Sequence, residues 1–190
     1  MLFVVFEGVD KGGKSTQTQC VADYLERYSS KAVVLTREPG GSPTGEKLRA
    51  IMLEEQMAPE TELLLMSAAR IEHLRNLVMP ALRRGCIVIC DRFVDSTYVY
   101  QGYIKGVNTT HIAYLERMMC APKPDLLFFF SRPYQQEITD RLEDVSKAKV
   151  VQGYRARMQP WWIQVPYDTK PNVTKFISHK IMECLRKQRS

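Results

Sequence analysis

Residues 6–16, FEGVDKGGKST, contain the residue types that hold the phosphates of a nucleotide. They fit the pattern G-x-x-x-x-G-K-[ST] through Gly8, Gly13, Lys14 and Ser15. Glycines let backbone N–H groups turn inward and form an anion-binding nest at a helix N-terminus. Lys14 would reach the β- and γ-phosphates, and Ser15 would ligate Mg²⁺ through its hydroxyl oxygen. The pattern predicts phosphate binding, but alone it does not separate a kinase from a switch GTPase or a motor ATPase.

A second signal is the Asp91-Arg92 pair, which follows the apolar run CIVIC. A carboxylate at a strand tip beside the phosphate loop can hold Mg²⁺ through water, and the adjacent arginine can neutralise a transferring phosphoryl group. Arg37 and Arg70 add cations that can hold the phosphates of two anions together. A switch GTPase needs one such arginine, and the guanine-reading motif N-K-x-D does not occur in the sequence. The residues therefore favour a nucleoside monophosphate kinase.

The phosphate loop is informative only between a strand and a helix, and the flanking residues predict both. Residues 2–6 are a continuous apolar run, which is typical of a strand buried on both faces. From Ser15, apolar residues at 21, 24, 25 and 28 follow helical spacing. Further strands are predicted at 32–36, 86–90, 126–130 and 162–165. Strands alternating with helices predict an α/β fold, a parallel sheet covered on both faces, with polar strand tips lining the ligand crevice.

Four helices are predicted beyond the phosphate loop. Two lie near 109–119 and 173–186, and a short one precedes residue 55. The longest begins near Pro59-Glu60 and ends at Gly85. The residues expected to face inward are Leu48, Ile51 and Met52 in the short helix, and Leu64, Ala68, Ile71, Leu74, Val78 and Leu82 in the long one.

Composition narrows the class of protein and its partners. The 190 residues are 45% hydrophobic and 25% charged, which predicts a single globular domain over 1–190 rather than a disordered chain. The net charge of +6 suits anionic partners, either nucleic acid or small nucleotides. No nucleic-acid-binding module is recognisable, so small nucleotides are expected. Five cysteines without a C-x-x-C pair indicate a reducing, cytoplasmic compartment. The N-terminal apolar run is too short for a signal peptide or a membrane span.

Four segments of the sequence resemble the thymidylate kinase family. They are FEGVDKGGKST, LTREPGGSPTGEKLR (35–49), LLLMSAARIEHLRNLVMPAL (63–82) and ICDRFVDSTYVYQG (89–102). REPGG and DR-x₃-S-T-x₂-YQG are much more specific to this family than the phosphate loop, and the middle segments are similar to its bacterial branch. The resemblance implies a P-loop nucleoside monophosphate kinase fold with a five-stranded parallel sheet. It also implies a homodimer that phosphorylates dTMP to dTDP with MgATP by direct in-line transfer.

The resemblance implies roles for residues around the acceptor nucleotide. Asp10 would accept a hydrogen bond from the 3′-hydroxyl of dTMP, Arg37 would hold the acceptor phosphate, and Arg92 would bridge donor and acceptor phosphates. Arg70 would hydrogen-bond the thymine carbonyl. Tyr100 would fill the space beside C2′ and exclude a ribose hydroxyl. The residues that would contact the base itself are Met66, Thr97 and Gln101.

The resemblance also implies an ATP site and a metal site. The metal ligands would be Ser15, Asp91 and Glu143, with Mg²⁺ as the cofactor. Arg141, together with the whole phosphate loop, would bind ATP; the loop residues are Gly8, Val9, Asp10, Lys11, Gly12, Gly13, Lys14, Ser15 and Thr16.

The sequence departs from the family pattern at two places. Met66 stands where the family usually places a phenylalanine that stacks on thymine, although a thioether can still pack on a ring. A 5-modified or other deoxypyrimidine is therefore an alternative acceptor. The lid, at about 132–150, is roughly ten residues shorter than the bacterial pattern and lacks its arginine-rich run. A weakly active nucleotide-binding protein is a further alternative, and we hypothesise that Lys11 supplies the charge that lid arginines supply elsewhere.

Overall fold

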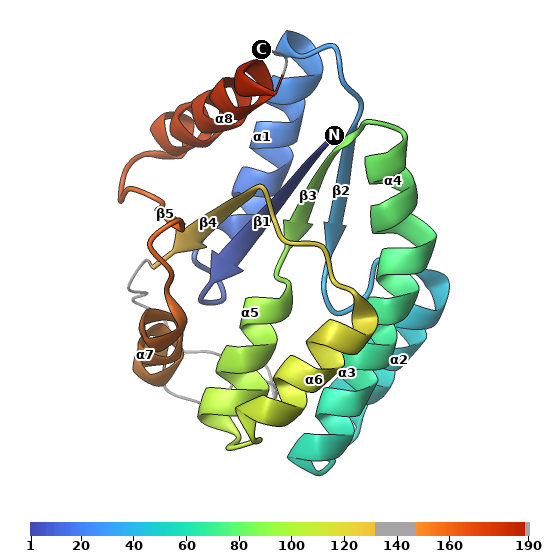
Figure 1. Ribbon diagram of the computed structural model, residues 1–190. Coiled ribbons are helices and arrows are strands. Elements are labelled where there is room, and N and C mark those ends of the chain that lie inside the picture. The colour runs from blue at the N-terminus through green and yellow to red at the C-terminus, as the bar shows by residue number, and fades with distance from the viewer. Residues whose placement is uncertain (132–146, 189–190) are drawn as a thin grey trace.

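The five strands form one parallel sheet in the computed structural model, which describes residues 1–131 and 147–188 (Figure 1). The strand order is β2-β3-β1-β4-β5. Neighbouring strands pair in parallel throughout, so the predicted five-stranded parallel sheet is confirmed. The strands are β1 (Leu2–Gly8), β2 (Val33–Arg37), β3 (Ile87–Asp91), β4 (Leu126–Phe130) and β5 (Ile163–Gln164).

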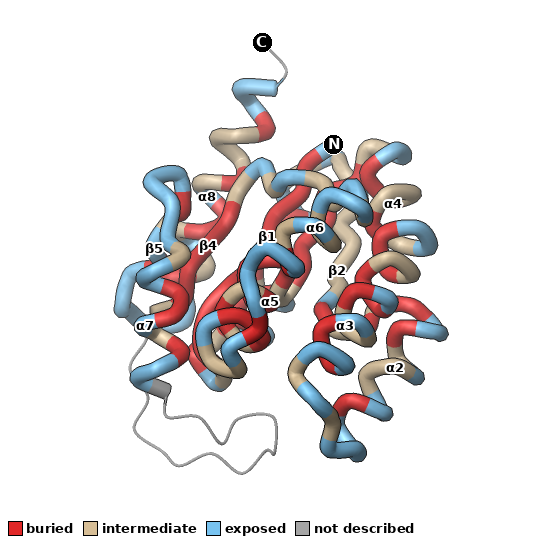
Figure 2. Tube along the Cα trace, turned by 60° about the horizontal axis from the view of Figure 1, so that its bottom comes forward, coloured by how far each residue is buried: buried red, intermediate tan, exposed pale blue. Residues whose placement is uncertain are grey.

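Helices cover both faces of the sheet because β1 is apolar on both sides. Leu2, Val4 and Phe6 pack with one hydrophobic cluster, whereas Phe3 and Val5 pack with another. Such alternation follows from the two-residue period of a strand. Figure 2 shows the strands buried between helices whose outer sides are exposed. The helices on the first face are α1 (Lys14–Tyr28) and α8 (Lys170–Lys187), and the second cluster includes residues of η1 (Leu74–Val78), α4 (Met79–Arg83), α5 (Val94–Thr97) and α7 (Lys147–Arg157).

The remaining helices stand beyond the C-terminal edge of the sheet (Figure 1), and α2, α3 and η2 contribute residues to the far side of the candidate site. Two of them, α2 and α3, pack against each other, and η2 continues directly from α5. Because parallel strands open a crevice at their carboxyl ends, this placement encloses a ligand between the sheet and these helices. The bounds are α2 (Pro43–Glu54), α3 (Pro59–His73), η2 (Tyr98–Ile104) and α6 (Thr109–Met119).

The long helix predicted from Pro59 to Gly85 consists of three consecutive segments, α3, η1 and α4. The prediction of which residues face inward is wrong for its first half. Leu64 is 58% exposed, Ala68 is exposed and Ile71 is only half-buried. The side of α3 turned toward the protein is mostly polar because it approaches the site; its buried residues are Glu62, Leu63, Ser67, Ala69, Arg70 and His73. In η1 and α4, which follow α3, the predicted Leu74, Val78 and Leu82 are buried as expected.

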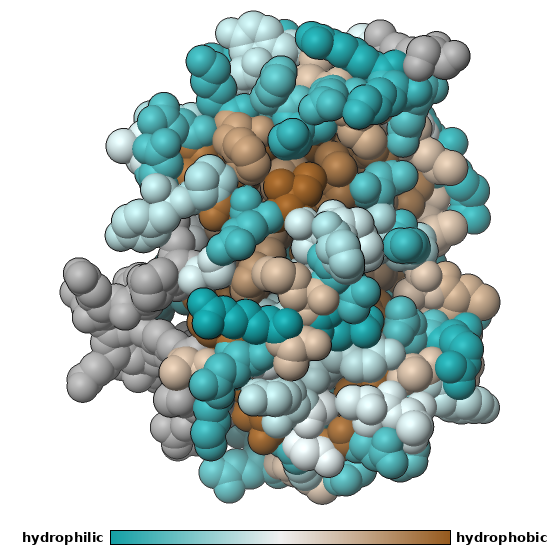
Figure 3. Space-filling model, turned by 60° about the vertical axis from the view of Figure 1, so that its left-hand side comes forward, coloured by the Kyte–Doolittle hydropathy of each residue, from teal (hydrophilic) through white to brown (hydrophobic). Residues whose placement is uncertain are grey.

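In the short helix α2, the predicted inward face is also only partly correct. Met52 is buried as expected, whereas Ile51 is 44% exposed and Leu48 is half-buried. On the face drawn in Figure 3, hydrophilic side chains dominate and hydrophobic ones show in patches between them. Within 1–131 and 147–188, no helix combines the length and the apolar character that crossing a membrane requires.

Candidate active site

The phosphate loop joins the end of β1 to the start of α1, as the sequence predicts. Gly8 has a φ of 135°, and a Cβ there would lie 2.2 Å from the carbonyl oxygen of Phe130 on β4. Gly13 has a φ of 95° and forms the N-cap of α1. Gly8 therefore requires glycine, because its positive φ and this close approach leave no room for a side chain. Gly13 favours glycine because of its positive φ. The loop presents the N-terminus of α1 to the crevice, where an anion is favoured.

Lys14 is held inside the loop by the loop's own carbonyl groups. Its Nζ donates to the carbonyl oxygens of Gly8 at 3.0 Å and Val9 at 2.8 Å. Burial, and next the nearby Arg92 cation, lower the pKa of Lys14 to about 8. This ammonium group has exchanged water for two carbonyl oxygens, so an anionic phosphate would compensate its charge better than its present partners do.

Ser15 and Asp91 lie together as the predicted metal ligands would. The Ser15 hydroxyl donates to Asp91 Oδ2 at 2.9 Å, and the buried Asp91 Oδ1 has no hydrogen-bond partner among residues 1–131 and 147–188. Among the described residues, no three His, Cys, Asp or Glu side chains cluster as metal ligands. Mg²⁺ needs only one or two protein carboxylates when substrate phosphates and water complete its shell. The Asp91 and Ser15 oxygens therefore fit Mg²⁺, whereas Arg141 and Glu143 lie outside the described residues.

Arg92 connects the phosphate loop to the helices beyond the sheet. Its backbone φ is 70°, and its guanidinium pairs with Asp10. It also donates to the Tyr154 hydroxyl at 3.0 Å and to the Tyr100 hydroxyl at 3.1 Å. Burial alone would raise the pKa of Asp10, but the Arg92 and Lys14 cations outweigh it and hold that pKa below its usual value. Asp10 is therefore a charged acceptor inside an anion-binding loop, with Arg92 as its counter-ion.

Glu7 and Tyr154 belong to a hydrogen-bond network that holds Arg92 in place, and neither residue was predicted from the sequence. Glu7 is fully buried on β1 and accepts hydrogen bonds from the Phe93 and Ser96 backbone N–H groups, the Ser96 hydroxyl and the Tyr154 hydroxyl. Ser96 and Tyr154 also bond Arg92 directly. A glutamate next to the apolar run 2–6 was the available signal, because a buried charge needs several hydrogen-bonding partners.

The buried Glu7 carboxyl predicts a specific pH dependence of stability. Burial, and next the Asp95 carboxylate, raise the pKa of Glu7 to about 7 from 4.5. Between these values the folded protein binds a proton that the unfolded chain releases, so stability falls as pH rises from 4.5 to 7. The contribution is about 3 kcal/mol. The free energies of unfolding of Glu7→Gln and wild type, measured with urea, should diverge by this amount between pH 4.5 and pH 7. The exposed Glu54→Gln should follow the wild type, and parallel curves for Glu7→Gln and wild type would contradict the assignment.

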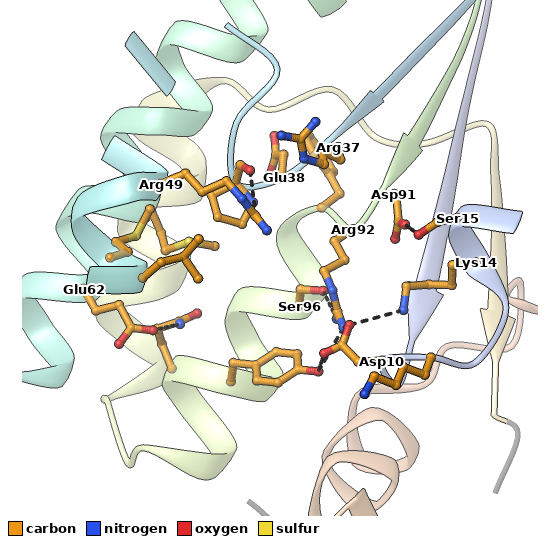
Figure 4. Close-up of a pocket in the computed structure, with 18 of the residues that line it drawn as sticks. Asp10, Lys14, Ser15, Arg37, Glu38, Arg49, Glu62, Asp91, Arg92 and Ser96 are labelled. Carbon is orange, nitrogen blue, oxygen red and sulfur yellow. Dashed lines mark hydrogen bonds and ion pairs between the residues drawn. The ribbon is translucent and has the colours of Figure 1, made fainter. Parts of the chain in front are cut away.

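A cavity of about 460 Å³ runs from the phosphate loop to α3. Figure 4 shows Lys14 and Ser15 at one end, Glu62 at the other and Arg92 between them. Of the predicted site residues, Gly8, Val9, Gly12, Arg70 and Thr97 are not part of its lining. The predicted residues that do line it are Asp10, Lys11, Gly13, Lys14, Ser15, Thr16, Arg37, Met66, Asp91, Arg92, Tyr100 and Gln101.

Three guanidinium groups converge on the middle of this cavity, and one of them was not predicted. Arg37 is 53% exposed and pairs with Glu46 at 2.8 Å. Arg49, on α2, donates to the Pro39 carbonyl at 3.1 Å. Burial lowers the pKa of Arg49, as does the neighbouring charge of Arg37. With Arg92, these cations give the cavity a cluster of positive charge next to the phosphate loop, and guanidinium groups of this kind can bind phosphate.

Arg70 lies behind the cavity wall rather than in it. Its Nε donates to the buried Glu38 at 2.6 Å, and its Nη2 donates to the Phe93 carbonyl and to Thr97 Oγ1. Glu38 also contacts His73 Nδ1 at 2.9 Å, and it lines the cavity itself. Burial would raise the pKa of Glu38, but Arg70 and His73 hold it below its usual value. The structure brings Arg70 and Thr97 together, with Arg70 Nη1 unbonded to the described residues.

The far end of the cavity combines apolar and charged groups. Met66 and Tyr100 line it together with the unpredicted pair Glu62 and Lys105, which form a salt bridge. Gln101 donates from Nε2 to Glu62 Oε1 at 2.7 Å. Apolar walls with a few placed polar groups are typical of sites for a flat organic ring.

Comparisons with known proteins find one family with similar sequences and a similar fold. The family model described as thymidylate kinase matches residues 6–160. A thymidylate kinase of Pseudomonas fluorescens is 49% identical over 138 residues, which cover 70% of this chain and 65% of that relative. A thymidylate kinase of Wolbachia pipientis is 42% identical over 147 residues, which cover 77% of this chain and 71% of that relative. The crystal structure of thymidylate kinase from Ehrlichia chaffeensis superposes with a TM-score of 0.77 at 32% identity, covering 97% of this chain and 98% of that one.

Proposed function

Because this chain belongs to the thymidylate kinase family, we propose that it transfers the γ-phosphoryl group of ATP to dTMP and forms ADP and dTDP. The observation that carries the proposal is the two-ended cavity, with Arg37, Arg49 and Arg92 between a phosphate loop and a ring-sized pocket. Two bound anions repel each other, and cations between them lower the cost of bringing them together. A nucleotide switch or motor needs no second phosphate site of this kind.

The residues that line the cavity divide between donor and acceptor. Lys14 and the N-terminus of α1 would bind the β- and γ-phosphates of ATP, whereas Arg37 and Arg49 would hold the phosphate of dTMP. Asp10 would accept the 3′-hydroxyl proton of dTMP in a hydrogen bond. Tyr100 stacks 4.9 Å below the Arg92 guanidinium, a place from which it would exclude a 2′-hydroxyl. The acceptor phosphate is already a nucleophile, so positioning and charge compensation account for the reaction.

The Met66 side chain would pack on the base in place of the stacking phenylalanine. Arg70 lies behind the cavity wall, so its predicted hydrogen bond to a base carbonyl would require Nη1, which is unbonded to the described residues, to reach the base from there. Lys11 lines the loop end of the cavity and makes no hydrogen bond or ion pair with residues 1–131 or 147–188. An ammonium group so placed is available to neutralise charge that develops on the transferring phosphoryl group. We assign it that role.

Asp91 and Ser15 would hold Mg²⁺, which would supply positive charge to neutralise the donor phosphates. Asp91→Asn is expected to raise the Mg²⁺ concentration for half-maximal activity about 10- to 100-fold, because it removes the charged ligand. Mn²⁺ binding in the presence of ATP, followed by electron paramagnetic resonance, should weaken in parallel. Asp23→Asn, an exposed aspartate on the same side of α1, is the matched control. Equal metal dependence in both variants would contradict the assignment.

One coupled assay tests the proposed function. ADP release is measured with dTMP, dUMP, dCMP, dGMP and 5-modified dUMP as acceptors, each at saturating MgATP. We expect dTMP to give the highest kcat/KM. A higher value with a 5-modified acceptor would replace dTMP as the substrate, as the Met66 side chain permits. No turnover with any acceptor would support a nucleotide-binding protein instead.

We also propose a cytoplasmic homodimer. All five cysteines are free thiols, which suits a reducing compartment. The exposed Leu64 on α3 and Ile51 on α2 give neighbouring helices apolar side chains that a second copy would bury. Sedimentation equilibrium measures the oligomeric state directly, and a monomer at micromolar concentration would contradict it.

A further inference from the structure

The far end of the cavity contains a chain of hydrogen bonds that runs in one direction. Lys105 pairs through its ammonium group with Glu62 Oε2, and Glu62 Oε1 accepts from Gln101 Nε2 at 2.7 Å. Lysine can only donate, and a carboxylate can only accept. The Gln101 amide must therefore turn its nitrogen toward Glu62. The opposite orientation would place its oxygen against a carboxylate, with two acceptors facing each other.

This orientation leaves the Gln101 carbonyl oxygen without a partner. Oε1 is buried and makes no hydrogen bond in the described part of the chain, although the Gln101 side chain lines the cavity. A buried acceptor left unsatisfied costs about 1–3 kcal/mol. A donor on a bound ligand would recover that cost. Glu62 lies at the end of the cavity away from Lys14, Ser15 and Asp91, so this ligand group belongs to the base rather than to a phosphate (Figure 4).

We propose that the Lys105–Glu62 pair positions the Gln101 amide so that its oxygen selects pyrimidines carrying an N3–H donor. Thymine and uracil have that donor, whereas cytosine presents an acceptor at N3 and would face the Gln101 oxygen with a like group. Glu62 and Lys105 are positioning residues, because they act on the base through Gln101. The inference rests on the proposed function, and it assigns base selectivity to a pair that touches neither phosphate.

The charges of Glu62 and Lys105 fix the orientation of the Gln101 amide, although the base itself is uncharged. A neutral partner such as glutamine could donate or accept, so the amide of Gln101 could turn over at little cost. The Glu62 carboxylate removes that freedom, and Lys105 compensates its charge where Glu62 is buried. Selectivity by an oriented hydrogen bond exceeds what the apolar Met66 wall could supply, because an apolar pocket rejects close analogues weakly.

The test compares dTMP with dCMP in wild type, Glu62→Gln, Gln101→Leu and the double variant. The wild type should prefer dTMP strongly in both kcat/KM and calorimetric affinity. Glu62→Gln should lower that preference about 10- to 100-fold. The loss should appear as a higher dTMP KM and a lower dCMP KM, with kcat for dTMP within about threefold. Glu60→Gln, an exposed change on the same helix, should retain the wild-type preference.

The double variant separates positioning from a general structural effect. If Glu62 acts through Gln101, then Glu62→Gln changes nothing further once Gln101→Leu is present. Additive losses, or an unchanged preference in Glu62→Gln with a normal melting temperature, would overturn the inference. If Glu62→Gln does not fold, Gln101→Leu still tests the Gln101 oxygen, and an unchanged preference there also overturns it. If the wild type does not phosphorylate dTMP, that result counts against the proposed function. The inference is still tested in that case, because calorimetry measures the affinities for dTMP and dCMP without turnover.

Discussion

Lys14→Met is expected to lower kcat/KM for ATP at least about 10³-fold without destabilising the protein. The ammonium group of Lys14 is the cation that the loop encloses, and its two carbonyl partners are replaceable by phosphate oxygens. Burial has already lowered the pKa of this lysine to about 8, so the folded protein holds the charge at a cost. Methionine fills the same space without that cost. The melting temperature is therefore expected to stay level or rise while turnover disappears.

The matched control for this change is Lys31→Met. Lys31 is a half-buried lysine that also donates to a backbone carbonyl, that of Gly85 at 3.4 Å, and it does not line the cavity. Its replacement should leave kcat/KM within about twofold. Thermal unfolding and steady-state kinetics on both variants measure the comparison. Retention of more than a tenth of the activity in Lys14→Met, or its failure to fold, would contradict the role of this lysine.

Lys11→Ala is expected to reduce kcat about 10³-fold, with the KM for dTMP unchanged within a few-fold. The side chain lines the cavity and has no partner among the described residues, so its loss removes charge without breaking a contact in that part of the protein. Its backbone φ is 55°, a left-handed conformation that costs a non-glycine residue about 1 kcal/mol. Because Lys11 costs the folded protein this strain, a role in phosphoryl transfer explains its presence better than a contribution to stability.

Three further variants sharpen the Lys11 experiment. Lys11→Arg keeps the charge and should recover kcat to within about tenfold of wild type. Lys11→Gly should be as inactive as Lys11→Ala, yet more stable by about 1 kcal/mol because glycine accepts positive φ. Lys47→Ala removes an exposed lysine from α2 and should behave as wild type. An unchanged kcat in Lys11→Ala would show that charge at this loop position is dispensable.

The sheet and the phosphate loop could be predicted because their signals are local. Five apolar runs predicted the strands. The position of the loop between a predicted strand and a predicted helix indicated that Gly8, Gly13 and Lys14 form a phosphate-binding loop. The inner face of α3 could not be predicted in the same way. Its buried Glu62 and Arg70 are polar because they serve the site, so hydrophobic periodicity selected Leu64 and Ala68 on the opposite side. The π-helical segment η1 has no comparable signal in the sequence.

The residues missed in the site have partners that are distant in the sequence. Tyr154 donates to Glu7 across 147 positions, and Lys105 pairs with Glu62 across 43. Spacing along the chain contains no information about such contacts, which the parallel sheet and its crossovers create. Arg49 was accessible in principle, since it follows the REPGG segment on a predicted helix. Its inward direction depended on how α2 packs against α3, and that could not be read from the residues.

Tyr154 has an evolutionary consequence as well as a structural one. Its hydroxyl attaches α7 to β1 and to Arg92, while Gln164 on β5 donates to the Ser131 hydroxyl at the end of β4. The chain is thus fastened on both sides of residues 132–146. The hydrogen bonds that place Arg92 therefore come from residues that lie far apart in the sequence, on both sides of that segment, so selection on the Arg92 geometry acts on several parts of the chain at once.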